Sequence, residues 1–163
     1  MREIKRTLER LAGGFKVALW GRGASTASVE RLFAKAGIEC VYYSDSPDDK
    51  KFDSGAAKKH RLAVYSPAFQ SSNKFFEAAK AAKVATLGEP DIAGKCWKGK
   101  IVAVSGTNGK TTTTALTGEI MAAHFGKDKT FVVGNIGTPY TSKALEMQDN
   151  TTTVAEISSF QLE

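Results

Sequence analysis

The chain has 163 residues, of which 42% are hydrophobic, and it carries a net charge of +6 from 23 basic and 17 acidic residues. These values are typical of a globular protein with one domain or two small ones, and they exclude a disordered tail. The basic residues are scattered in ones and twos, so we expect a solvated surface and no nucleic-acid groove. No stretch approaches the roughly 18 consecutive apolar residues of a membrane span, so no membrane insertion is expected.

The cysteines and the amino-terminal segment favour a cytoplasmic location. Cys40 and Cys96 are far apart and have no CxxC spacing, which favours reduced thiols over a disulfide or a metal pair. The first residues, MREIKRTLERLAGG, are charged and show a helical pattern without the apolar core of a signal peptide. His60 and His124 share no metal-ligand spacing.

Strand-like and helix-like segments alternate along the first half of the sequence. We expect a helix over residues 2–12, a second capped by Ser25 or Thr26 and ended by Gly37, and a third over residues 72–82. The expected strands are FKVALW, IECVYYSD, RLAVYSPA (broken by Pro67) and KVATLG, and residues 46–59 are expected to form a loop. This alternation predicts an α/β fold with a parallel sheet, whose ligands collect at the carboxyl ends of the strands.

A turn-rich stretch, EPDIAGKCWKG over residues 89–99, separates two such arrangements, because the pattern of strand, glycine turn and helix begins again after it. We therefore expect two domains, residues 1–97 and residues 98–163. The second domain should contain the strands KIVAVSG, TFVVGN and TTTVAEIS, a helix over residues 109–124 and another near 141–147.

The segment GTNGKTT, which follows the strand KIVAV, has the composition of a phosphate-binding turn. Glycines let the backbone approach phosphate oxygens closely, and the helix that follows offers unpaired N–H groups and the positive end of its dipole. Lys110 would add a mobile cation, and the hydroxyl of Thr111 is placed to bind Mg²⁺. The match to G-x-x-x-x-G-K-[ST] is incomplete, because Val104 stands where the first glycine should be. A turn that only caps a helix is the alternative.

The first glycine turn, GRGAST, is ambiguous by itself. Gly21 and Gly23 match the first two glycines of G-x-G-x-x-G, but Thr26 takes the third position, and Asp45 lies 24 residues after Gly21. A dinucleotide-binding domain therefore stays open on this local pattern. The phosphate-binding turn GTNGKTT argues against a dinucleotide-binding domain, because a dehydrogenase has no use for such a turn.

Three segments in order, GTNGKTT, GNIGTP and VAEISSFQLE, resemble motifs of the Mur ligase family, the ATP-dependent enzymes that form amide bonds in peptidoglycan precursor synthesis. The ending SSFQLE is most similar to the members that add D-glutamate. The segments GRGAS, SD and VYSPA stand where those members bind a uridine nucleotide, so the resemblance covers nearly the whole chain. It implies a Rossmann-like, parallel-sheet UDP-binding domain over residues 1–97, followed by the first part of a P-loop-type central ATPase domain over residues 98–163.

The resemblance also implies a role for each matching residue. Lys110 and Glu156 would be catalytic, and Thr111 and Glu156 would bind Mg²⁺. The phosphates of ATP would be bound by Gly106, Thr107, Asn108, Gly109, Lys110, Thr111 and Thr112. The UDP-substrate would be bound by Gly21, Arg22, Gly23, Ala24, Ser25, Thr26, Asp45, Ser46, Ser66, Pro67, Ala68 and Asn135. Ser46 stands where D-glutamate-adding members commonly carry a basic residue, and the candidates that replace it are Lys50, Lys51 and Arg22.

The implied reaction joins D-glutamate to UDP-N-acetylmuramoyl-L-alanine through an acyl phosphate, with ATP and Mg²⁺, in bacterial cell-wall synthesis and hence in cell shape and division. The family's downstream histidine, carbamylated lysine and third domain are not in the sequence. We therefore expect an amino-terminal fragment that is inactive alone, from a full-length protein that is a monomer. Two alternatives stay open: another ligase of the same fold, such as a folylpolyglutamate synthase-like enzyme, and a non-catalytic nucleotide-binding module.

Overall fold

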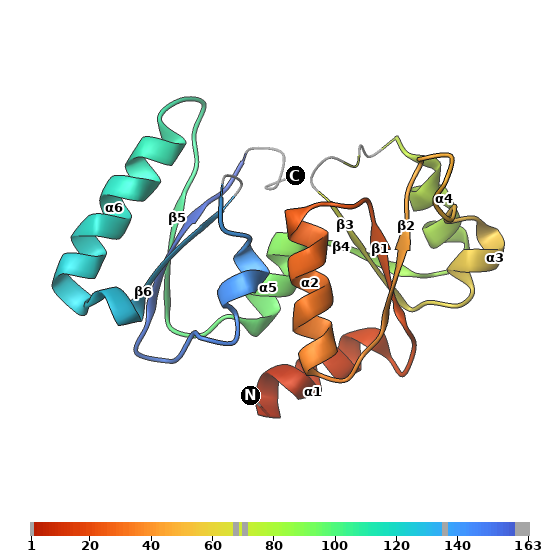
Figure 1. The fold of residues 1–163 in the computed structure, drawn as a ribbon, viewed down its shortest axis with the longest axis horizontal. Helices are drawn as coiled ribbons and strands as arrows, with labels where there is room; N and C mark the ends of the chain where they lie inside the picture. Colours follow the sequence, from red (N-terminus) through yellow and green to blue (C-terminus); the bar gives the residue numbers. More distant parts are fainter. Residues whose placement is uncertain (1, 67–68, 70–71, 135–136, 159–163) are drawn as a thin grey trace. The chain divides into compact units, whose positions relative to one another are not determined.

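A computed structural model describes all residues except 1, 67–68, 70–71, 135–136 and 159–163. The chain forms two compact units, Met1–Lys95 and Cys96–Glu163, and each is built on its own parallel sheet (Figure 1). The expected α/β class with parallel sheets is therefore confirmed. The division falls two residues before the position expected from the turn-rich stretch.

The first unit contains a four-stranded parallel sheet with the strand order β2-β1-β3-β4. Its strands are β1 (Val17–Trp20), β2 (Cys40–Tyr43), β3 (Leu62–Tyr65) and β4 (Ala85–Gly88). The helices along this part of the chain are α1 (Arg2–Ala12), α2 (Ala24–Lys35), α3 (Ser54–Ala57), α4 (Lys74–Ala81) and α5 (Glu89–Cys96), and α5 reaches the division between the units.

Strand β1 lies in the middle of the core, and all four of its residues are fully buried. A continuous apolar run of this kind is typical of a parallel strand that is covered on both faces. Trp20, at its carboxyl end, has four phenylalanine rings with centroids 4.9 to 5.9 Å from its own, those of Phe52, Phe69, Phe75 and Phe76. The aromatic part of the core therefore lies directly before the first glycine turn, around the last residue of β1.

Two helices occupy segments that the sequence suggested were irregular. Helix α3 lies inside the expected loop 46–59 and is too short to show a periodic pattern; the Asp53 side chain caps it by accepting from the N–H of Ala56 at 2.7 Å. Helix α5 lies inside the expected turn-rich stretch. Its Pro90 is in the first turn, where a missing N–H costs nothing, and Asp91 accepts from the N–H of Gly88 at 2.8 Å.

The second unit contains a three-stranded parallel sheet with the order β5-β7-β6. Its elements are β5 (Lys100–Val104), α6 (Lys110–Phe125), the 3₁₀ helix η1 (Lys127–Lys129), β6 (Thr130–Gly134), the 3₁₀ helix η2 (Tyr140–Lys143) and β7 (Thr152–Glu156). The helix expected near 141–147 is thus a single 3₁₀ turn, because the described backbone continues as turns after Lys143.

Helix α6 approaches its sheet closely through small residues. Thr114 and Gly118 are buried, and a Cβ atom added at Gly118 would lie 2.4 Å from Cγ2 of Val132 on β6. Leu116 and Ile120 lie elsewhere on the helix surface and are 61% and 58% exposed. None of the described helices combines the length and apolar character needed to cross a bilayer.

His60 is buried in the first unit by two polar contacts. Its Nδ1 is 2.6 Å from the carbonyl oxygen of Lys16, and its Nε2 is 2.8 Å from the hydroxyl of Tyr43. The neutral ring satisfies both contacts when Nδ1 donates to the carbonyl and Nε2 accepts from the tyrosine. Burial lowers the pKa of His60 below its ordinary value of 6.5, although the bond to the Lys16 carbonyl acts in the opposite direction.

We expect the first unit to lose stability as the pH falls below about 6.5, because the unfolded histidine then binds a proton more readily than the folded one. The contribution of His60 to the free energy of unfolding is complete at pH values above the pKa of the histidine in the unfolded chain. It decreases as the pH falls, until the pH reaches the lower pKa of the histidine in the folded chain. The measurement is urea unfolding between about pH 7.5 and about pH 5.5. Unfolding of the first unit is followed by the fluorescence of Trp20, in a Trp97→Phe background that removes the tryptophan of the second unit.

In the same assay, His60→Gln should flatten this pH dependence. His124→Gln, which replaces an exposed histidine of the second unit, should leave it unchanged. An equal pH dependence in His60→Gln and its parent would contradict the prediction.

Candidate functional site

Strand β5 passes into helix α6 through an exposed turn over residues 105–109. Gly109 has a φ of +73° directly before the helix, and Gly106 has a φ of +146°, conformations that residues with a Cβ adopt rarely. No described backbone carbonyl accepts a hydrogen bond from the N–H groups of residues 106–109. The turn therefore offers several N–H groups to an anion at the start of a 16-residue helix.

The side chain of Lys110 folds back over this turn. Its Nζ donates to the carbonyl oxygen of Gly106 at 2.7 Å and lies 3.4 Å from that of Thr107. A bound anion would compete with these carbonyls for the ammonium group, because the lysine is a flexible cation with three donors. Thr111 and Thr112 follow it in the first helical turn and are exposed.

Glu156 lies at the carboxyl end of β7, the middle strand of the second sheet. The sheet register places it between Val104 on β5 and Gly134 on β6, so it shares a sheet edge with the turn that follows β5. The residue is 4% exposed, and its carbonyl oxygen accepts a hydrogen bond from the hydroxyl of Tyr140. Among the described residues no group of three or more His, Cys, Asp or Glu side chains forms a metal cluster. A cation here would therefore need oxygens from a ligand as well as protein oxygens.

Gly134 allows β6 to pair closely with Glu156. A Cβ atom at position 134 would lie 2.6 Å from Cβ of Glu156 and 2.8 Å from its carbonyl oxygen, and the φ of Gly134 is +156°. The N–H of Gly134 donates to the carbonyl of Thr138 at 3.0 Å, which closes the GNIGTP segment. Asn135, the expected substrate contact in that segment, lies outside the described residues.

We expect Gly134→Ala to destabilise the second unit by about 2 to 4 kcal/mol. The added Cβ atom would clash with the backbone and the Cβ atom of Glu156, and neither can move away without a further cost in free energy. Thermal unfolding followed by Trp97 fluorescence, in a Trp20→Phe background, measures the change. Gly94→Ala is the control, because a Cβ atom there meets no atom within 4 Å. Equal melting temperatures for Gly134→Ala and the parent would refute the close approach.

In the first unit, the expected residues Gly21 and Ser66, which follow β1 and β3, meet at one edge of the sheet. The strand order β2-β1-β3 places the two strands after β1 on its opposite sides, and ligands of α/β proteins bind at such a switch point. Gly21 follows β1 with a φ of +86°, and a Cβ atom there would lie 3.3 Å from Cβ of Ser66. The N–H of Ser66 donates to the carbonyl of Trp20 at 3.0 Å. Pro67 and Ala68 lie outside the described residues.

Thr26 stabilises this first turn from within. The expectation that Ser25 or Thr26 caps helix α2 is wrong, because the cap is Gly23 and the helix begins at Ala24. Thr26 is 1% exposed; its hydroxyl accepts from the N–H of Gly23 at 3.1 Å and lies 3.1 and 3.2 Å from the carbonyls of Gly21 and Gly23. Its hydroxyl is therefore occupied by the backbone.

The loop after β2 carries the expected residues Asp45 and Ser46, and both are exposed. The side chain of Asn73 donates to Asp45 at 2.5 Å, while its Oδ1 accepts from the N–H of Phe75 and caps α4. The Nζ of Lys51 donates to the carbonyl of Ser46 at 2.6 Å, so this candidate cation braces the loop. Asn73 could have been recognised as a helix cap from the sequence NKFFEAAK, but its contact with Asp45 has no local signal.

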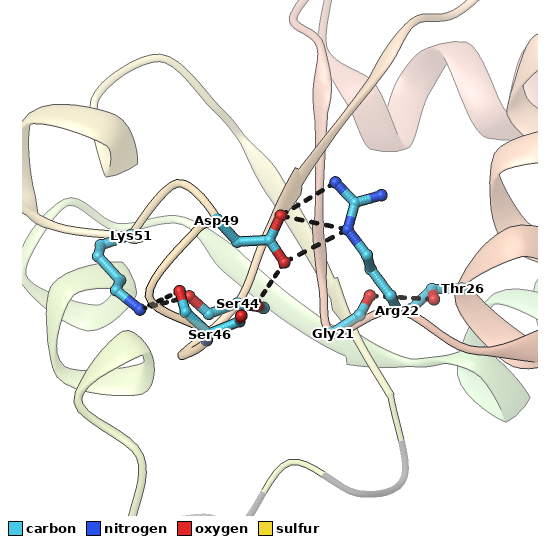
Figure 2. Close-up of polar contacts among 7 residues, drawn as sticks. All are labelled: Gly21, Arg22, Thr26, Ser44, Ser46, Asp49 and Lys51. Atoms are coloured by element: carbon cyan, nitrogen blue, oxygen red, sulfur yellow. Dashed lines mark hydrogen bonds and ion pairs between the residues drawn. The ribbon is translucent and has the colours of Figure 1, made fainter.

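Arg22, from the glycine turn, reaches Asp49 in the same loop (Figure 2). Its Nη2 is 3.1 Å from Oδ1, and its guanidinium carbon is 4.7 Å from the centre of the Tyr42 ring. The hydrogen bond from Arg22, with a second from Ser44, holds the pKa of Asp49 below its ordinary value. Sequence analysis missed Asp49 because it is one acid among several in a polar stretch.

Comparisons with known proteins agree with the geometry of the second unit. Residues 104–163 match the Mur ligase middle domain, a segment that includes the turn, Lys110 and Glu156. The resemblance to the Mur ligase family recognised in the three ordered motifs is therefore confirmed.

Similar full proteins carry the name UDP-N-acetylmuramoylalanine–D-glutamate ligase. The one from Lachnospira eligens is 40% identical over 90% of this chain and 36% of its own length. The one from Aquifex aeolicus is 34% identical over 90% of this chain and 34% of its own. That of Alkaliphilus metalliredigens is 50% identical over 63% of this chain and 22% of its own. The chain thus spans about a third of the length of the first two relatives.

Proposed function

We propose that this chain supplies the UDP-substrate site and the ATP-phosphate site of an ATP-dependent ligase that adds D-glutamate to UDP-N-acetylmuramoyl-L-alanine. The observation that carries the proposal is the open turn at residues 106–109, with Lys110 folded over it at the start of α6. This turn lies in the segment that matches the Mur ligase middle domain. The relatives' names supply the substrates. In this proposal the reaction belongs to peptidoglycan precursor synthesis in the bacterial cytoplasm.

In this proposal the second unit mainly positions and neutralises phosphate groups. The N–H groups of residues 106–109 bind phosphate oxygens, and Lys110 exchanges the carbonyls of Gly106 and Thr107 for the terminal phosphates of ATP. The γ-phosphoryl group passes to the carboxylate of the UDP-substrate. The resulting acyl phosphate is attacked by the amine of D-glutamate, and inorganic phosphate leaves as the amide forms.

Thr111 and Glu156 fit a magnesium site shared with the ligands. A hydroxyl in the first turn of α6 and a carboxylate at the same sheet edge are hard oxygen donors of the kind that Mg²⁺ prefers. Mg²⁺ would supply charge neutralisation between ATP and the substrate carboxylate. Glu156 would hold the metal there and would not act as a general base.

The first unit binds the uridine nucleotide at the β1–β3 switch point in this proposal. The backbone of residues 22–26 and the hydroxyl of Ser25 would contact the diphosphate, and Asp45, Ser46 and Ser66 would flank the uridine. A non-catalytic nucleotide-binding module would use the same turns. Both the relatives' names and the buried carboxylate of Glu156 at the edge that carries the phosphate turn favour the ligase.

Lys110→Ala should weaken binding of Mg²⁺–ATP about tenfold or more, because charge-assisted hydrogen bonds to phosphate contribute about 1.5 to 3 kcal/mol. Calorimetric titration of the chain measures this. Lys127→Ala is the matched control, because Lys127 lies just past the opposite end of the same helix. Equal affinities in Lys110→Ala and the parent would remove the phosphate role of the lysine.

A titration with UDP-N-acetylmuramoyl-L-alanine tests the first unit separately. We expect binding of about micromolar affinity, equivalent to roughly 8 kcal/mol. We expect no displacement by NADH, which would compete if the first turn were a dinucleotide site. Saturable NADH binding without binding of the UDP-substrate would assign the unit to the other class.

A further inference from the structure

The side chain of Arg22 is the one cation of the first glycine turn, GRGAST, and it extends to Asp49 in the loop after β2. Its Nε lies 3.3 Å from each carboxylate oxygen of Asp49, and its guanidinium group lies over the ring of Tyr42. The hydroxyl of Tyr42 donates to Glu30 at 2.9 Å, so the ring under the guanidinium is itself fixed. Figure 2 shows Arg22 and Asp49 facing each other, with Ser44 on the opposite side of the carboxylate.

Asp49 is fixed by its own loop, independently of Arg22. Its Oδ2 accepts from the hydroxyl of Ser44 at 2.7 Å, and its backbone N–H donates to the carbonyl of Ser46 at 3.1 Å. The Nζ of Lys51 holds the carbonyls of Ser44 and Ser46 together. The Asp49 side chain is 21% exposed and that of Arg22 is 60% exposed, so the guanidinium is the more accessible partner and the easier one to displace.

We propose that Asp49 competes with the diphosphate of the uridine nucleotide for Arg22, so that this pair sets the affinity of the first unit for anionic nucleotides. The proposal rests on the nucleotide site proposed above and adds the residue pair that determines its selectivity. A guanidinium group recognises carboxylate and phosphate with the same fork of donors, so one can replace the other. Arg22 belongs to the turn that would contact the diphosphate, and a rotation of its side chain would bring the guanidinium toward that group.

The pair also explains how this chain manages without a basic residue after Asp45. Lys51 is engaged with the carbonyls of its own loop, and Lys50 is an exposed residue at the end of the loop. Arg22 belongs to the turn itself, so it is the candidate closest in the chain to the backbone groups that would contact the diphosphate. An exposed ion pair contributes little to stability, so releasing Arg22 from Asp49 has a small cost for the fold.

Calorimetric titration with UDP and with uridine tests this proposal in the parent chain and three single variants. Arg22→Ala should weaken UDP binding about tenfold, because it removes a charge-assisted contact with phosphate. Asp49→Asn keeps an acceptor for Ser44 and should tighten UDP binding about threefold or more, because Arg22 is released. Uridine has no phosphate, so its affinity should change less than about twofold in both variants. Asp48→Asn, which removes the same charge at an exposed neighbouring position, should change neither affinity.

The double variant Arg22→Ala/Asp49→Asn separates competition from simple repulsion. If Asp49 acts through Arg22, the gain from Asp49→Asn disappears when Arg22 is absent. An equal or larger gain in that background would show through-space repulsion and overturn the proposal. Weaker UDP binding in Asp49→Asn would overturn it as well, because Asp49 would then position Arg22 for the ligand.

The wild-type titration distinguishes failure of this inference from failure of the proposed function. If the parent chain binds UDP and Arg22→Ala binds it equally well, the inference is wrong and the nucleotide site stands. If the parent chain binds neither UDP nor UDP-N-acetylmuramoyl-L-alanine, the nucleotide site is wrong and the inference falls with it.

Discussion

Parallel strand pairing is the constraint on which both candidate sites depend. When neighbouring strands run in the same direction, their carboxyl ends meet at one edge, and every residue that follows a strand begins there. In the second unit this pairing aligns Val104, Glu156 and Gly134 across three strands, so a carboxylate and a glycine turn far apart in the sequence share one edge. In the first unit it places the turn after β1 beside Ser66. The chemistry of each edge then depends on which backbone groups the turn leaves unpaired.

The two glycine turns differ in which of their backbone N–H groups are paired. In the first, the N–H of Gly21 donates to the carbonyl of Tyr43, and the N–H of Gly23 is bound by the hydroxyl of Thr26. In the second, no described carbonyl accepts from the N–H groups of residues 106–109, and the nearest side-chain cation folds onto the carbonyls instead. The second turn therefore leaves its backbone N–H groups available to an anion. The first has fewer N–H groups to offer, which gives side-chain charge a larger share in any anion binding there.

Much of this arrangement could be predicted from local sequence. Short segments such as VALW, LAVY and TTVAE form strands inside the expected ones, and Gly21 follows the first of them where expected. The turn at residues 106–109 was recognisable as a candidate phosphate site because its two glycines, a lysine and a threonine lie within six consecutive residues. Errors arose where a residue type has two meanings. Pro90 was taken as a turn residue although proline is equally suited to a first helical turn, and Thr26 was taken as a cap although it binds the capping residue from inside the helix.

What could not be predicted are contacts between loops, because they depend on how the sheet brings separate strand ends together. Asp49 lies 27 residues from Arg22, and Asn73 lies 28 residues from Asp45, yet each pair is joined by a hydrogen bond at the carboxyl edge of the first sheet. No periodicity or spacing rule marks such pairs. Once β1 and β2 are paired in register, however, the loop after β2 must pass near the turn after β1, and a fixed acid there will meet a flexible arginine. The sheet thus creates the polar contacts of the first site as a consequence of its topology, and the loop residues decide which charges remain available to a ligand.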